Sequence, residues 1–155
     1  MPLDQALNFN ATITWVFHRW PQVSTGMVDG KLFGYRVPLV TGTAEDDVTG
    51  SLTYYFGPDK ELRRITLKGD TGDAHKLVKW LSTQFGLVQQ AADKRGVFVY
   101  RANRKNSTSE LKVRPRAIMR SSDPHQRFEV ALVLDRPATE KEADEPSRFS
   151  LFGNR

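Results

Sequence analysis

The chain has 155 residues, the usual size of one domain. It contains no cysteine, which excludes disulfide bonds, zinc–thiolate sites and cysteine nucleophiles, and no apolar run is long enough to span a bilayer. The net charge of +5 comes from one segment: residues 94–136 hold eleven basic and four acidic side chains, whereas residues 1–93 and 137–155 each have a net charge of −1. This asymmetry points to an anionic partner such as nucleic acid, an anionic glycan or an acidic protein surface.

The first predicted element is a helix over residues 12–20. Its apolar side chains recur at helical spacing, Thr12 or Thr14 caps the first turn, and Pro21 ends the helix. The stripe consists of Ile13, Val16, Phe17 and Trp20.

A strand over residues 32–40 and a hairpin over residues 50–69 follow. Pro38 places the first strand at a sheet edge or a bulge. In the hairpin, Gly57-Pro58-Asp59 supplies the turn. Alternation directs one set of hairpin side chains to the core, namely Leu52, Tyr54, Phe56, Ile65 and Leu67, and the other set outward, namely Thr53, Tyr55, Arg64, Thr66 and Lys68.

The second half of the chain predicts another helix and three more strands. Helical spacing of apolar residues covers 74–85, and Gly86 is placed to end that helix in a left-handed conformation. Strands are expected over 96–101, 110–118 and 127–134, with a flexible connection over 103–109. From residue 137 the composition becomes polar and acidic, as in disordered tails.

The element order predicts an α+β fold, a two-layer sandwich in which two helices cover one face of a mainly antiparallel sheet of about six strands. One domain over residues 3–136 and a disordered tail over 137–155 are expected. The order also suggests a duplicated αβββ unit. Two short matches point the same way: Phe33–Arg36 resembles Phe98–Arg101, and Ile65–Leu67 resembles Val130–Leu132.

The sheet face away from the helices is the predicted site. Six of its outward residues are candidates for binding a polyanion, because cations meet phosphates and an aromatic ring stacks on bases. They are Tyr55, Arg64, Lys68, Lys112, Arg114 and Arg116. The alternative is that these side chains only keep an exposed antiparallel face soluble, and composition favours this second interpretation.

Catalytic and metal-site patterns are not found in the sequence. His18, His75 and His125 lack metal-ligand spacing, and Glu45-Asp46-Asp47 reads as a solvated loop. No nucleophile elbow, phosphate loop or dinucleotide fingerprint occurs. We therefore expect no cofactor and no metal, and we favour a non-enzymatic role. A hydrolase with a carboxylate pair set only by the fold stays as the last alternative.

Several segments resemble an uncharacterised bacterial domain family of unknown function over residues 3–136. They are Arg19–Gly26, Tyr35–Gly42, Gly50–Phe56, Thr71–Asp73 and Lys76–Val78. The resemblance implies no activity, cofactor or site. Because members of such families often carry a membrane anchor, it leaves the compartment open between cytoplasm and envelope.

Two functional hypotheses come first. One is a structural or protein-binding domain in a bacterial envelope assembly, and the other is a binder of single-stranded nucleic acid or another polyanion. The apolar motif Arg148–Gly153 at the end of the tail either docks into a partner, folds back on the domain or frays.

Overall fold

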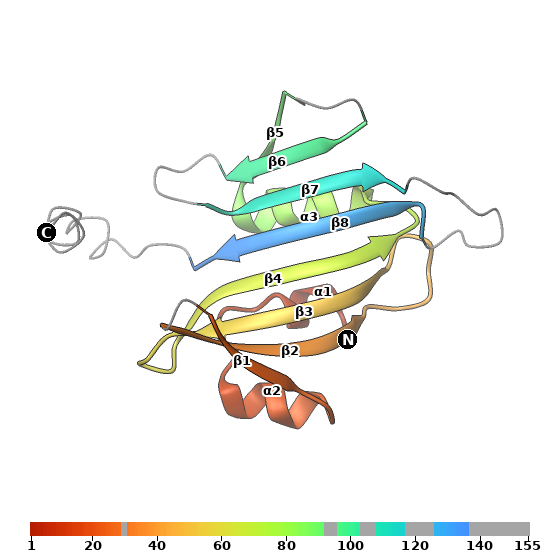
Figure 1. Ribbon diagram of the computed structural model, residues 1–155. Helices are drawn as coiled ribbons and strands as arrows, with labels where there is room; N and C mark the ends of the chain where they lie inside the picture. Colours follow the sequence, from red (N-terminus) through yellow and green to blue (C-terminus); the bar gives the residue numbers. More distant parts are fainter. Residues whose placement is uncertain (29–30, 92–95, 103–107, 117–125, 137–155) are drawn as a thin grey trace, which may run out of the picture.

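The computed structural model describes residues 1–28, 31–91, 96–102, 108–116 and 126–136. Its described helices are α1 (Leu3–Ala6), α2 (Ile13–Arg19) and α3 (His75–Phe85). The strands are β1 (Ser24–Val28), β2 (Leu32–Val40), β3 (Val48–Phe56), β4 (Leu62–Thr71), β5 (Leu87–Gln90), β6 (Phe98–Ala102), β7 (Glu110–Pro115) and β8 (Phe128–Asp135). They form one open antiparallel sheet in the order β1-β2-β3-β4-β8-β7-β6-β5 (Figure 1).

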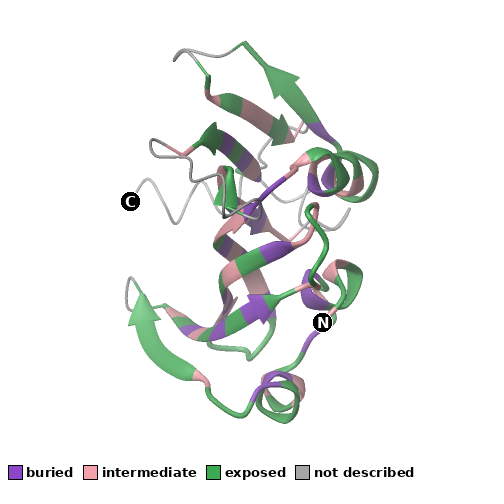
Figure 2. Ribbon diagram, turned by 90° about the vertical axis from the view of Figure 1, so that its right-hand side faces the viewer, coloured by how far each residue is buried: buried purple, intermediate pink, exposed green. Residues whose placement is uncertain are grey.

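The three helices lie on one side of this sheet (Figure 2). The α+β class and the antiparallel pairing are confirmed, but the expected six strands and two helices are too few for the described residues. Three short elements were missed: α1, β1 and β5. All five residues of β1 are exposed, so this strand has no apolar alternation from which it could be recognised.

The expected hairpin is present as β3 and β4. Its five predicted core side chains are buried, and Leu52 pairs with Leu67 in the register. Pro38 lies in β2, where β1 has already ended, because the last residue of β2 that pairs with β1 is Arg36. Proline is therefore tolerated at a local edge, as expected.

The two longer helices begin and end where the sequence predicts. Thr12 Oγ1 accepts a hydrogen bond of 3.1 Å from the backbone N–H of Trp15, and Gly86 ends α3 with φ of 67°. Leu77 and Leu81 of α3 are buried. One expectation is wrong: Phe17 of the predicted apolar stripe is 49% exposed. It lies at the margin of the buried face of α2, where its ring packs edge-on against the ring of Tyr35.

The centre of the sheet joins segments that are far apart in sequence. β4 pairs with β8, so that Leu67 lies opposite Leu132. Both side chains are buried in the core under the helices. The other face of β4, β8 and β7 carries no described helix, which leaves it as the open face (Figure 2).

Several predicted features lie outside the described residues. They are most of the connection over 103–109, the end of the strand over 110–118, His125, and the whole segment 137–155 with its Arg148–Gly153 motif. The domain boundaries at residues 3 and 136 stay a prediction. None of the described helices has the length and apolar character that a bilayer crossing requires.

Candidate functional site

The structure brings all six predicted binding residues to the open face. Alternation along each strand sends their buried neighbours to the helix side, as with Leu111 and Val113 on either side of Lys112. Lys68, Lys112 and Arg114 are exposed, and the remaining three are partly buried. Lys112 and Arg114 alternate with buried residues of β7, and Arg116, one residue past the end of this strand, contacts the outward carboxylates Asp70 and Glu129.

One crosswise row of side chains runs through the middle of the open face. Lys68 of β4 pairs with Ala131 of β8, and Ala131 pairs with Lys112 of β7. The two lysines thus flank one small exposed side chain. Since neighbouring strands are about 4.8 Å apart, the two lysine backbones are about 10 Å apart. The row continues outward through Ser51 and Pro38 on one side and Val99 and Gln90 on the other.

A hollow of about 710 Å³ is centred on this row. Its volume falls in the range of small-molecule sites, roughly 300–1,000 Å³. It is lined by residues of β3, β4, β8, β7 and β6 and by the residue before β6, including Lys68, Lys112, Arg114, Ala131, Val97 and Val99.

Gly50 and Gly69 form one boundary of the hollow, and they face each other in the β3–β4 pair. A Cβ on Gly50 would lie 2.1 Å from the carbonyl oxygen of Lys68. Glycine is therefore required for the two strands to approach this closely.

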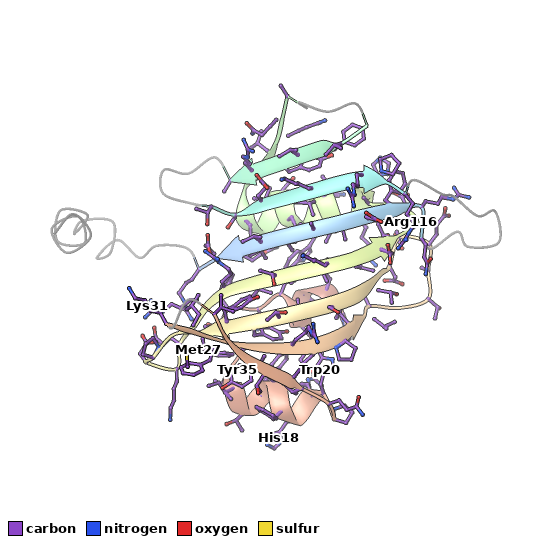
Figure 3. The ribbon with its side chains drawn as sticks, viewed as in Figure 1. His18, Trp20, Met27, Lys31, Tyr35 and Arg116 are labelled. Carbon is purple, nitrogen blue, oxygen red and sulfur yellow. The ribbon has the colours of Figure 1, made fainter. Side chains whose placement is uncertain are left out.

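The predicted arginines of the open face are held by carboxylates. Arg64 Nε lies 2.8 Å from Asp135 Oδ1, and Arg114 donates to Glu129 with a shortest N–O distance of 2.6 Å. Arg116, at the end of β7 (Figure 3), contacts Asp70 and also lies 3.8 Å from Glu129.

The two lysines are less engaged. Lys112 Nζ lies 3.6 Å from Glu110, which Arg101 also contacts at 2.7 Å. Lys68 has no ion pair within the part of the chain that the structure describes. The outward residues of β2 to β8, together with Arg116, include seven cations and four carboxylates. The open face therefore has a surplus of three positive charges. The cations are Arg36, Arg64, Lys68, Arg101, Lys112, Arg114 and Arg116, and the carboxylates are Asp70, Glu110, Glu129 and Asp135.

Aromatic side chains are sparse on this face. Among the described strand residues that point outward, Tyr55 is the single aromatic, and its ring covers Gly34, where a Cβ would lie 3.0 Å from Tyr55 Cε1. The other aromatic residues of β2 and β6 belong to the helix side by alternation, namely Phe33, Tyr35, Phe98 and Tyr100. The stacking platform of a single-stranded nucleic-acid binder is thus not assembled from the described residues.

The histidine and acidic candidates have local structural roles. His75 is almost fully exposed and hydrogen-bonds Asp73, and the N–H of His75 lowers the pKa of the Asp73 carboxyl. His18 is exposed on α2. Within the described ranges, no group of three His, Asp or Glu side chains is arranged to hold a metal ion.

Asp47, in the loop before β3, accepts hydrogen bonds from Thr41 Oγ1 at 2.8 Å and from the Ala44 N–H at 2.9 Å. Burial raises its pKa, but these hydrogen bonds and the Lys76 ammonium outweigh burial and lower it. The acidic loop is therefore organised by its own hydrogen bonds.

Sequence reasoning missed part of this site. Val99 comes from β6, whose register was not fixed, and Val97 precedes that strand. Cross-strand ion pairs such as Arg64–Asp135 join residues 71 positions apart, so no local pattern reveals them.

Comparison with known families gives one match. A model described as a family of unknown function (DUF6690) matches residues 1–148. The chain belongs to this family. The resemblance to a family of unknown function is thereby confirmed, and the match extends further than residues 3–136. Neither a curated protein nor a solved structure matches the chain. Because the function of DUF6690 is unknown, membership in this family assigns no activity to the chain.

Proposed function

We propose that this DUF6690 protein is a non-enzymatic binding domain whose open face receives an anionic ligand. The observation that carries the proposal is the pair of lysines on either side of Ala131, in a hollow whose arginines are already occupied by carboxylates. Lys68 has no ion pair among the described residues, and Lys112 has only a 3.6 Å contact with Glu110, so these two flexible ammonium groups are the donors most available to an incoming anion.

Charge recognition fits the face better than base stacking does. A sequence-tolerant binder of single strands interleaves cations with several aromatic rings, whereas Tyr55 is the single aromatic among the described outward strand residues. We therefore rank single-stranded nucleic acid below other anions.

A hydrolase is the weakest of the three hypotheses. A carboxylate pair that acts as acid and base needs two unlike environments. The four carboxylates of the open face, Asp70, Glu110, Glu129 and Asp135, each contact an arginine, so their surroundings are alike.

The proposal is tested by calorimetric titration with a panel of anions: octyl phosphate, a heparin fragment and oligothymidylate. We expect at least one to bind at about 50 mM salt, with affinity that falls toward 200 mM. The double variant Lys68→Gln/Lys112→Gln should weaken binding at least about tenfold. Lys31→Gln/Lys79→Gln makes the same change in net charge away from the hollow and should leave affinity unaltered. Absence of binding by every anion at the lower salt would refute the proposal.

A second candidate, a structural domain that assembles with its own copies, is favoured by the exposed edge strand β1. Ser24–Val28 carries no charge and no proline, the usual protections of a sheet edge. Met27, labelled in Figure 3, is 60% exposed and pairs with Phe33, which is 41% exposed. Because β1 has no charged residues, it could pair antiparallel with β1 of a second copy without bringing like charges together.

Sedimentation of the full chain over a range of concentrations tests this candidate. We expect a dimer that Met27→Lys dissociates, because lysine at an edge blocks strand pairing. A wild-type protein that stays monomeric at all concentrations would exclude it. An envelope location is compatible with either candidate.

We also propose that the fold arose by duplication of an αββββ unit, one strand longer than the unit expected from sequence. The element order supports this, since α2 leads into β1–β4 and α3 leads into β5–β8. The two sequence matches fall on equivalent strands, β2 with β6 and β4 with β8. In both, the second segment lies 65 positions after the first along the chain. The same interval joins Leu67 to Leu132, the pair at the centre of the sheet.

A further inference from the structure

We infer that the ligand of the open face is a small amphipathic anion, with a compact carboxylate or phosphate head and an apolar chain. The inference rests on the proposed function and narrows it to a ligand class. The head lies between Lys68 and Lys112, above Ala131, and the chain lies over Val97 and Val99.

The charge available in the hollow suits one anionic head. Arg114 is bound to Glu129, and Arg116 is bound to Asp70 and lies near Glu129. Lys68 and Lys112 are thus the loosely held cations at the centre, about 10 Å apart at the backbone. Their side chains are long and flexible, so both ammonium groups reach one head placed above Ala131. A polymer of phosphates needs a line of such cations, and the flanking rows offer arginine–carboxylate pairs instead.

The floor of the hollow suits an apolar chain. Ala131 is exposed in the central row, and Val99 continues the row one strand beyond Lys112. Val97 also lines the hollow, and Val133 lies next along β8 on the same face. From β4 to β6 the hollow spans three strand spacings, about 14 Å. A ligand with its head at the lysines therefore lays its chain toward β6, on valine side chains that water otherwise covers.

The lining of the hollow favours an amphipathic anion over a simple inorganic anion. An inorganic anion uses only the lysines, whereas small-molecule sites combine a mostly apolar lining with a few polar groups that fix orientation. The hollow has both parts side by side, with Lys112 directly between Ala131 and Val99. Binding should therefore need head and chain together.

Isothermal titration calorimetry of the full chain tests the inference with five probes: octanoate, octyl phosphate, acetate, inorganic phosphate and octanol. We expect octanoate or octyl phosphate to bind at least about tenfold more tightly than the matching head alone and than octanol. A preference for one of the two amphiphiles identifies the head as carboxylate or phosphate.

Two variants locate the site in the same experiment. Ala131→Glu places a carboxylate between the lysines, and Lys68→Gln/Lys112→Gln removes their charge. Each should weaken binding of the amphiphile at least about tenfold, while Lys31→Gln/Lys79→Gln should change it less than about twofold. All the substituted side chains are exposed, so circular dichroism should show unaltered folding.

Four results would overturn the inference, and they bear differently on the proposed function. If amphiphiles bind no more tightly than acetate or phosphate, the apolar floor contributes nothing, but an anion site remains. If heparin or oligothymidylate binds the face and octanoate does not compete, the ligand is a polyanion and the proposed function survives. If octanol binds as tightly as octanoate, or if nothing binds, both fall.

Discussion

The hydroxyl of Tyr54 in β3 donates a hydrogen bond to the backbone carbonyl oxygen of Ala6 in α1, and both residues are fully buried. Burial also raises the pKa of the Tyr54 phenol, so it stays protonated as the donor. The contact fixes the short helix α1 to the sheet, because a buried carbonyl needs a partner. The same tyrosine ring lies near Trp15 and Trp20, which link it to α2.

Replacing Tyr54 by phenylalanine should destabilise the protein by about 1–3 kcal/mol, since the Ala6 carbonyl loses its donor while the ring packing is kept. Urea unfolding measures the difference. Tyr55→Phe on the open face is the control and should stay within about 0.5 kcal/mol of wild type. Equal losses in the two variants would mean that the hydrogen bond contributes nothing.

Gly50→Ala should destabilise the protein by about 1–3 kcal/mol, because the added Cβ meets the backbone of β4 and the strands must separate. Gly26→Ala is the matched control: a Cβ there has no neighbour within 4 Å, and its stability should change by less than about 1 kcal/mol. Thermal unfolding compares them. A Gly50 variant as stable as the Gly26 variant would show that the close approach of the strands is unnecessary.

Asp47→Asn should lower stability by about 1–2 kcal/mol at neutral pH, because the carboxylate accepts hydrogen bonds from Thr41 and Ala44. The pKa of Asp47 is lowered in the folded state, so its contribution is present above the unfolded value near 3.9 and disappears as pH falls through the folded value. Unfolding free energies measured from pH 7 down to pH 2 should therefore converge. A difference that persists at the acid end would exclude the ionised carboxylate as the cause.

Arginine and lysine on the open face should behave differently when neutralised. Arg116→Gln leaves Asp70 and Glu129 without their shared cation and should cost about 1–2 kcal/mol of stability. Lys68→Gln should stay within about 0.5 kcal/mol, as surface substitutions do. Denaturant midpoints distinguish the two. If Lys68→Gln proves as damaging as Arg116→Gln, the lysine has a structural role and is not reserved for a ligand.

Much of the fold was predictable where burial imposes a period on the sequence. Leu52, Tyr54 and Phe56 alternate because every second residue of β3 enters the core, and Leu77 and Leu81 recur because one face of α3 does. β1 is exposed along its whole length and β5 buries only Leu87, so neither leaves such a period.

The residues of the open face were also predictable from alternation, but their arrangement was not. Alternation assigned Lys68, Lys112 and Arg114 to the open face without any knowledge of strand order. That Lys68 and Lys112 flank Ala131 depends on the β4–β8 pairing, which joins Lys68 to a residue 63 positions further along the chain and is set by tertiary packing. The ion pair of Arg64 with Asp135 comes from the same β4–β8 pairing, whereas that of Arg114 with Glu129 comes from the β7–β8 pairing.

The most direct test of anion binding at the open face is a ¹H–¹⁵N correlation spectrum recorded during titration with whichever of octanoate and octyl phosphate binds more tightly. We expect the largest amide shifts at Ser51, Lys68, Ala131, Lys112 and Val99, the central row, with α2 and α3 unaffected. Shifts confined to the helix side, or a spectrum that does not change at low salt, would contradict the account.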